Sequence, residues 1–188
     1  MDANAVSDDE LYDRYKNGDT SAYDELILRY KDGLTAYLNV MLHSVPDAED
    51  MMIEAFAYIM EKKPQISRGN FKAYLFQAGR RYAIRLKTRS HRKDEFSLEG
   101  LDLEPIAAGS VEKEAITDEL REILHRCMER IDPAMREALY LVYIDGLSHL
   151  QAARVMKVVP KKINNLITRG KQKLREELKK EGISDPNI

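Results

Sequence analysis

Residues 146–169 read GLSHLQAARVMKVVPKKINNLITR, and this stretch predicts the architecture of the second half of the chain. Ser148 followed three residues later by Gln151 is the pattern of a capping box, so a short helix should begin there. A brief turn at residues 157–159 leads to Pro160, and proline is favoured at the first position of a helix. A short helix, a turn and a basic helix in this order are typical of a helix-turn-helix.

Two more helices are expected before this motif. One should run from residue 111 to residue 131. The next should start at Asp132 and Pro133, which combine a good N-cap residue with a proline at the first helical position, and it should end at Gly146. We expect this second helix to bury Leu139, Val142 and Tyr143. The single cysteine, Cys127, should be a thiol that packs between helices.

The first 93 residues predict four helices. The pattern at residues 7–10 is a capping box, and the helix that it begins should end at Gly18. Asp19 or Thr20 should cap a long second helix, whose apolar face continues until Pro46 interrupts it. The residues of that face are Leu26, Ile27, Tyr30, Leu34, Tyr37, Leu38 and Met41.

The third and fourth helices carry opposite charges on their outer faces. Asp47 should cap the third helix, and its buried side should contain Met52, Ala55, Phe56 and Ile59. After a loop that ends at Asn70, the fourth helix should bury Phe71, Leu75, Ala78 and Tyr82. Because Arg81, Arg85 and Arg89 are spaced four residues apart, they should project from one side of this helix.

The net charge of −2 conceals a strong segregation of charge along the chain. Residues 67–93 contain 9 basic and no acidic side chains, and residues 157–180 contain 9 basic and 2 acidic ones. Between them, residues 94–122 contain 2 basic and 10 acidic side chains. One basic run is often only a solvated helix face, but two such runs in an acidic protein suit a polyanion contacted at two places. The pattern therefore favours nucleic acid as a partner.

Several classes of protein are not expected from this sequence. The length of 188 residues allows one large or two small domains. The 4 histidines lack metal-ligand spacing, and the chain has no glycine-rich phosphate loop, nucleophile elbow or second cysteine. We therefore expect no enzyme activity, no metal and no cofactor. No apolar run approaches the ~18 to 20 residues of a membrane helix, and the first residues do not resemble a signal peptide, so we expect a cytoplasmic protein.

Three segments resemble the bacterial sigma factors of RNA polymerase, specifically the small extracytoplasmic function (ECF) group that keeps only regions two and four. Residues 47–56, DAEDMMIEAF, resemble the region-two motif DAEDLxQExF. Residues 71–75, FKAYL, resemble the start of the promoter-reading part of region two. Residues 146–153, GLSHLQAA, resemble the helix-turn-helix of region four. The three segments occur in the order that the family shows.

The resemblance implies an all-α fold of two small helical domains. Region two would occupy residues 1–93, and region four, with the helix-turn-helix, would occupy residues 112–188. A flexible acidic linker would join them at 94–111, either as a solvated tether or as a segment that follows the path of RNA in the polymerase. The implied partners are core RNA polymerase, through its β′ and β subunits, promoter DNA and an anti-sigma factor, without insertion into a membrane.

The resemblance also assigns three binding surfaces. Contact with core polymerase falls on the outer face of the third helix, at Asp47, Asp50, Ile53 and Glu54. The alternative is that this face is only solvent-exposed and binds no partner. Contact with the minus-ten promoter element falls on Asn70, Lys72, Arg80, Arg81, Arg85 and Arg89. The loop at 64–70 would accept a base flipped out of the non-template strand. Contact with the minus-35 element falls on Lys161, Lys162, Asn165, Thr168, Arg169, Lys171 and Lys173. Tyr74 and Phe76 could stack on bases, but packing in the core is favoured.

Several residues depart from the family pattern, including Leu150 and Gln151, where Glu and Ile are usual. Gln is usual at Ile53, Asn at Arg81 and Asp at Arg85, so both arginines add charge to the DNA face. Val159 stands where Ser or Thr usually caps the last helix, which should cost about 1 kcal/mol, partly offset by Pro160. Two other functions stay open: a sigma-like decoy that sequesters an anti-sigma factor, and a stand-alone helix-turn-helix regulator. The basic faces argue against the decoy, because a protein decoy does not need them. A stand-alone regulator would bind duplex DNA tightly without core polymerase.

Overall fold

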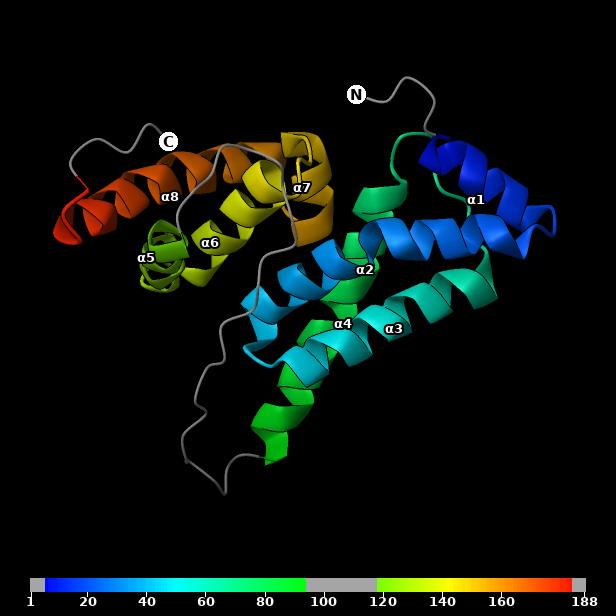
Figure 1. Cartoon of the computed structure of the whole chain (residues 1–188), viewed down its shortest axis with the longest axis horizontal. Coiled ribbons are helices and arrows are strands. Elements are labelled where there is room, and N and C mark those ends of the chain that lie inside the picture. Colours follow the sequence, from blue (N-terminus) through cyan, green and yellow to red (C-terminus); the bar gives the residue numbers. More distant parts are fainter. Residues whose placement is uncertain (1–5, 94–117, 184–188) are drawn as a thin grey trace. The chain divides into compact units, whose positions relative to one another are not determined.

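The computed structural model describes residues 6–93 and 118–183. The chain divides into two compact units, Met1–Gly109 and Ser110–Ile188, and every described element is a helix (Figure 1). The all-α class expected from the sequence is therefore confirmed. The segment 94–111, where we expect the linker, lies outside the described residues, as does the first part of the helix expected from residue 111. Within the two described ranges, no helix combines the length and the apolar character needed to cross a membrane.

The described part of the first unit contains four helices, and side chains cap the first three. The four helices are α1 (Asp8–Lys16), α2 (Thr20–Leu42), α3 (Val45–Lys62) and α4 (Phe71–Lys93). Ser7 caps α1 and Asp19 caps α2, as expected. The expected Asp47 cap is wrong: the Ser44 hydroxyl accepts a hydrogen bond from the Asp47 amide and caps α3. Pro46 therefore lies in the first turn of α3, where a backbone N–H would have no partner within the helix.

Tyrosine hydroxyls hold α1 and α2 against the carboxyl-terminal half of α3. Three of them donate to carbonyls spaced four residues apart: Tyr23 to Phe56 at 2.6 Å, Tyr15 to Met60 at 2.8 Å and Tyr12 to Pro64 at 2.9 Å. Because residue 64 is a proline, the Met60 carbonyl lacks its usual helical donor, and Tyr15 supplies one. These bonds satisfy carbonyls near the end of α3 and fix its position along α1 and α2.

The core of the first unit also sets the position of α4. At Gly79, an added Cβ would lie 3.1 Å from Leu34 Cδ1 in α2, so this glycine permits a close approach. Phe76 is fully buried and stacks on Tyr37 with ring centroids 5.3 Å apart. Packing in the core, the favoured interpretation of Phe76, is therefore confirmed. Met52 of α3 is only half-buried, contrary to expectation.

The second unit contains the predicted helix-turn-helix. Its elements are α5 (Asp118–Glu129), α6 (Pro133–Leu139), the π-helical turn η2 (Tyr140–Ile144), α7 (His149–Met156) and α8 (Pro160–Lys180). Asp132 caps α6, and Cys127 is buried, as expected. Tyr143, expected to face inward, is 52% exposed. The π-helical turn, in which the Asp145 amide bonds to the Tyr140 carbonyl at 3.0 Å, accounts for this error because it rotates the following side chains away from the α-helical phase.

Helices α7 and α8 are positioned by local capping and by close packing. The capping box of α7 is complete: the Gln151 amide donates to Ser148 Oγ at 3.2 Å, and the Ser148 amide donates to Gln151 Oε1 at 3.0 Å. Helix α8 packs against α6 at Gly170, where an added Cβ would lie 3.1 Å from Leu139 Cδ1. The buried side of α8 includes Ile163, Ile167, Leu174 and Leu178. The opposite side of this basic helix is left to solvent.

Candidate nucleic-acid and polymerase interfaces

The outer face of α3 combines acidic side chains with an exposed aliphatic one. Asp47, Asp50 and Glu54 are exposed, and the side chain of Ile53 between them is 58% exposed. The opposite side of α3 is packed by buried Ala55 and other core residues. The structure thus brings the four residues predicted to contact polymerase onto one accessible face.

The cations of α4 fall into two groups. Arg85 and Arg89 are exposed and form no ion pair with the described residues. Arg81 is exposed too, but its guanidinium carbon lies 4.6 Å from the centroid of the Tyr58 ring in α3 and 5.3 Å from that of Tyr82. Arg81 is therefore held in place by two aromatic rings, whereas no ring from residues 6–93 or 118–183 lies against the other two arginines.

A chain of side-chain contacts links α3 and α4 at this point. Hydrogen bonds from Tyr74 and from Arg81 lower the pKa of the Tyr58 hydroxyl below its ordinary value. Burial, followed by its hydrogen bond to Tyr58, raises the pKa of Tyr74 to about 12. Sequence reasoning missed Tyr58 because the contact joins two helices, and no local pattern in either helix indicates it. Tyr74 itself is half-buried and packs within this group.

The remaining residues predicted to contact the minus-ten element are partly covered. Lys72 is half-buried, with its ammonium nitrogen 5.8 Å from the Tyr30 ring centroid and 5.3 Å from that of Phe76. Arg80 is half-buried as well. The side-chain amide of Asn70 donates to the Arg68 carbonyl at 2.9 Å. The six predicted residues therefore do not form one uniform basic surface.

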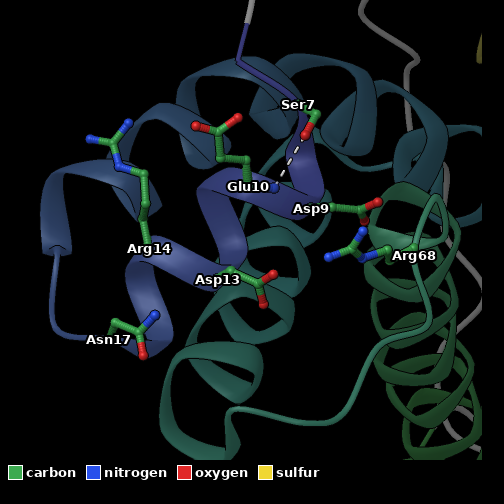
Figure 2. A pocket seen from close by; sticks show the side chains of 7 residues that line it. All are labelled: Ser7, Asp9, Glu10, Asp13, Arg14, Asn17 and Arg68. Atoms are coloured by element: carbon green, nitrogen blue, oxygen red, sulfur yellow. Dashed lines mark hydrogen bonds between the residues drawn. The ribbon is translucent and has the colours of Figure 1, made fainter.

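A pocket of about 430 Å³ lies beside α1 (Figure 2). It is lined by Ser7, Asp9, Glu10, Asp13, Arg14, Asn17 and Arg68. A hydrogen bond from Lys16 is the largest cause that lowers the pKa of Asp13, and the charge of Arg68 adds to it. The wall combines three carboxylates with two guanidinium groups, so its formal net charge is only −1.

The minus-35 residues expected in α8 separate along the helix. The first five, Lys161, Lys162, Asn165, Thr168 and Arg169, are all exposed. Further along, the ammonium of Lys171 lies 4.3 Å from the Tyr143 ring centroid, and that of Lys173 lies 2.7 Å from a carboxylate oxygen of Glu176. The amino-terminal half of α8 therefore offers cations and amides to a partner, while the second half has internal contacts.

The start of α8 is fixed by contacts with α7 and not by a side-chain cap. Val159 occupies the N-cap position, forms no capping hydrogen bond and is 66% exposed, which confirms the expected loss of the cap. His149 Nδ1 of α7 lies 2.7 Å from Asn164 Oδ1 of α8 and joins the two helices across the turn.

The chain is similar to known proteins. Residues 121–174 match the family described as sigma-70, region 4. The ECF RNA polymerase sigma factor SigM of Bacillus subtilis (strain 168) is 26% identical over 138 residues, which are 73% of this chain and 83% of SigM. The ECF RNA polymerase sigma factor SigW of the same organism is 26% identical over 175 residues, which are 87% of this chain and 92% of SigW. These matches together support an ECF sigma factor.

The fold of this ECF sigma factor agrees with that of a solved structure. The sigma factor RpoE of Bartonella quintana, solved in complex with the anti-sigma factor NepR, superposes with a TM-score of 0.66 at 21% identity. The match covers 84% of this chain and 96% of RpoE. As a sigma factor, the chain directs RNA polymerase to promoters. The residues matched by the region-4 family include all of α7 and much of α8.

Proposed function

We propose that this sigma factor binds core RNA polymerase through the outer face of α3 and contacts promoter DNA through α4 and α8. The observation that carries the proposal is that each unit presents one basic helix, packed on one side by apolar residues and exposed on the other. In this assignment residues 1–93 are region two, residues 112–188 are region four and residues 94–111 are the linker between them.

In the first unit, contact with the minus-ten element would divide between two kinds of residue. Arg85 and Arg89, exposed and without an acidic partner among the described residues, would neutralise phosphates. Lys72 and Arg81, held near aromatic rings, would contribute charge from fixed positions. The loop at 64–70, which leads directly into α4, would accept the base that leaves the duplex during opening.

In the second unit, α8 would enter the major groove at the minus-35 element, as the second helix of a helix-turn-helix does. Lys162, Asn165 and Arg169 would lie near base edges, since they project from the exposed side of the first half of α8. Lys171 and Lys173, further along, would meet phosphates.

The proposed partners are the β′ and β subunits of core polymerase, promoter DNA and an anti-sigma factor. The acidic and aliphatic face of α3 suits the β′ subunit in the arrangement that the family resemblance implies. The structure of RpoE with NepR supports the proposal of an anti-sigma factor, because the two sigma factors share a fold. We also propose that the protein acts in the cytoplasm, by binding and not by catalysis.

Run-off transcription with purified core polymerase and a library of genomic promoters tests the proposal. Wild-type protein should direct transcripts from a defined subset of promoters. Asp50→Lys combined with Glu54→Lys should weaken binding to core polymerase, because it reverses the charge of the α3 face without touching its packed side. Asp24→Lys combined with Asp32→Lys is the matched control, since both acids are exposed on α2.

Three outcomes would count against this function. Equal core affinity for both double variants would remove the α3 face as the docking surface. Protection of duplex DNA by the chain alone, with no transcript, would favour the stand-alone regulator. Binding of an anti-sigma factor without any transcript in the presence of core polymerase would favour the decoy.

A further inference from the structure

The segment that joins α3 to α4 is attached to α1 near both of its ends. At the α3 end, the Tyr12 hydroxyl donates to the Pro64 carbonyl at 2.9 Å. At the α4 end, the backbone N–H of Gly69 donates to the carboxylate of Asp9, with both oxygens 2.9 Å from the nitrogen. Asp9 and Gly69 are 60 residues apart in the sequence, so no local pattern predicts this contact.

The peptide group between Arg68 and Gly69 is held on both sides. Its N–H donates to Asp9, and its carbonyl accepts from the Asn70 side-chain amide at 2.9 Å. The backbone N–H of Asn70 donates to the Ser67 carbonyl at 3.1 Å, which closes a turn whose third residue, Gly69, has φ +69°. Glycine adopts positive and negative φ about equally well, so the turn alone leaves the direction of this peptide open. The two side-chain hydrogen bonds select one direction.

The charge around Asp9 favours a strong bond. A hydrogen bond to an ionised carboxylate is stronger than one between neutral groups. Figure 2 shows the Arg68 side chain pointing toward Asp9, so a guanidinium from the loop supports the carboxylate that holds the loop. Ser67 and Arg68 are themselves exposed, and their orientation toward solvent depends on the peptide that Asp9 holds.

We infer that Asp9 is a positioning residue for the loop at 64–70 and thereby sets promoter preference at the base that this loop accepts. The inference rests on the proposed function, because it takes the loop to be the part that receives a base. Asp9 acts through the Gly69 backbone and does not touch DNA. Helix α1 is in this view the support of the base-accepting loop, with Tyr12 at one end and Asp9 at the other.

Two substitutions of Asp9 and one control separate this role from general effects of charge. Asp9→Ala removes the acceptor, whereas Asp9→Asn removes the charge and keeps one acceptor oxygen. Asp13→Ala makes the same change one helical turn later, at a residue of the same pocket whose bond is to Lys16 at 2.7 Å. All three lower the negative charge beside the loop by one, but only the Asp9 variants change the contact with Gly69.

The first measurement is amide hydrogen exchange of Gly69 by NMR in the free protein. We expect exchange about tenfold faster in Asp9→Ala, the factor that corresponds to losing one hydrogen bond to a charged group. Asp9→Asn should lie between Asp9→Ala and wild type, and Asp13→Ala should match wild type. Unchanged exchange in both Asp9 variants would overturn the contact itself.

The second measurement is selection by the holoenzyme from promoters randomised across the minus-ten element. Asp9→Ala should weaken the preference at one position about tenfold while leaving the minus-35 preference and core affinity as in wild type. Asp9→Asn should show a smaller change, and Asp13→Ala should show none. Faster exchange with an unchanged selection profile would overturn the positioning role. If Asp9→Ala does not fold, Asp9→Asn provides both measurements, and wild-type results in both would overturn the inference.

The two experiments distinguish a failure of the proposed function from a failure of the Asp9–Gly69 contact. A wild-type protein that directs no transcription would contradict the proposed function and overturn the promoter-preference part of the inference. The exchange experiment needs neither polymerase nor DNA, so its result still decides whether Asp9 holds the loop.

Discussion

Helices α4 and α8 are both basic, but they hold their cations in opposite arrangements. In α4 the early cations, Lys72 and Arg81, lie over aromatic rings, and the later ones, Arg85 and Arg89, are exposed. In α8 the early cations are exposed and the later ones contact partners within the unit: Lys171 with Tyr143, Lys173 with Glu176 and Lys180 with Glu177. A count of basic residues therefore overestimates the charge that each helix offers to DNA.

The surroundings of the two helices explain the difference. The first unit is rich in tyrosines, and α4 crosses α3 beside Tyr58, so a guanidinium from α4 reaches two rings. Helix α8 instead carries two acids of its own, Glu176 and Glu177, which pair with lysines three residues away. We therefore propose that Arg85 and Arg89 in α4, and the early cations of α8, contribute more to DNA binding than the cations that contact rings or acids within their own unit.

The largest expected effect separates the two halves of α8. Arg169→Ala should cost about 1 to 3 kcal/mol of discrimination at one position of the minus-35 element, because a well-placed arginine reads a base edge through two hydrogen bonds. Lys173→Ala, whose ammonium is paired with Glu176, should weaken binding evenly across sequences. Selection from randomised minus-35 sequences measures both. Identical sequence preferences for Arg169→Ala and wild type would contradict base readout by this helix.

A smaller effect is expected at the start of α8. The three capped helices of the first unit begin at Ser7, Asp19 and Ser44, whereas Val159 gives α8 no side-chain cap. Val159→Ser should stabilise the second unit by about 1 kcal/mol, because its hydroxyl can accept from a free amide of the first turn. Thermal unfolding followed by circular dichroism checks this, with Val159→Ala as control. Equal melting temperatures for the Ser and Ala variants would show that Pro160 and the contact with α7 already stabilise the start of α8 without a side-chain cap.

The division within α4 predicts a still smaller effect. Arg81→Ala should destabilise the first unit by about 0.5 to 1 kcal/mol through the lost cation–π contacts and should lower the salt dependence of promoter binding less than Arg85→Ala does. Arg85→Ala should leave stability unchanged and lower the slope of log affinity against log salt by about 0.9. Urea unfolding and holoenzyme binding at several salt concentrations measure the two. If Arg81→Ala lowered the salt slope more than Arg85→Ala and left stability unchanged, Arg81 would contact phosphate and the rings of Tyr58 and Tyr82 would not hold it.

The smallest effect concerns acid. Hydrogen bonds from Ser21 and Arg14 lower the pKa of Asp19 to about 2 in the folded first unit, whereas an unfolded chain has an aspartate pKa of about 3.9. A depressed folded pKa contributes stability above pH ~4, and this contribution is lost as the pH falls toward 2. Asp19→Asn keeps a capping side chain without the titration, so its melting temperature should approach that of wild type between pH 5 and 2.5. If the melting temperatures of the variant and wild type differed by the same amount at every pH in this range, Asp19 would not contribute to the loss of stability in acid.

Much of the fold follows from short-range sequence patterns. Ser7, Asp19, Asp132 and the Ser148–Gln151 pair mark helix starts because each satisfies backbone amides within its own first turn. Apolar spacing likewise predicted most of the buried side of α4, where Phe71, Leu75 and Ala78 are buried and Tyr82 is half-buried. The patterns failed where two local signals competed: Ser44 and Asp47 are both good caps, and Pro46 between them stops one helix as readily as it starts another.

The sequence by itself determined that this protein has two basic helices and a helix-turn-helix, because periodicity, caps and charge are properties of neighbouring residues. Only the tertiary structure decided which cations are held and which are exposed, since the rings beside Arg81 and the carboxylate beside Gly69 come from other helices. The same holds for Tyr143, which the π-helical turn directs to the surface. Contacts between distant residues depend on how helices pack, and a one-dimensional pattern contains no distance between helices.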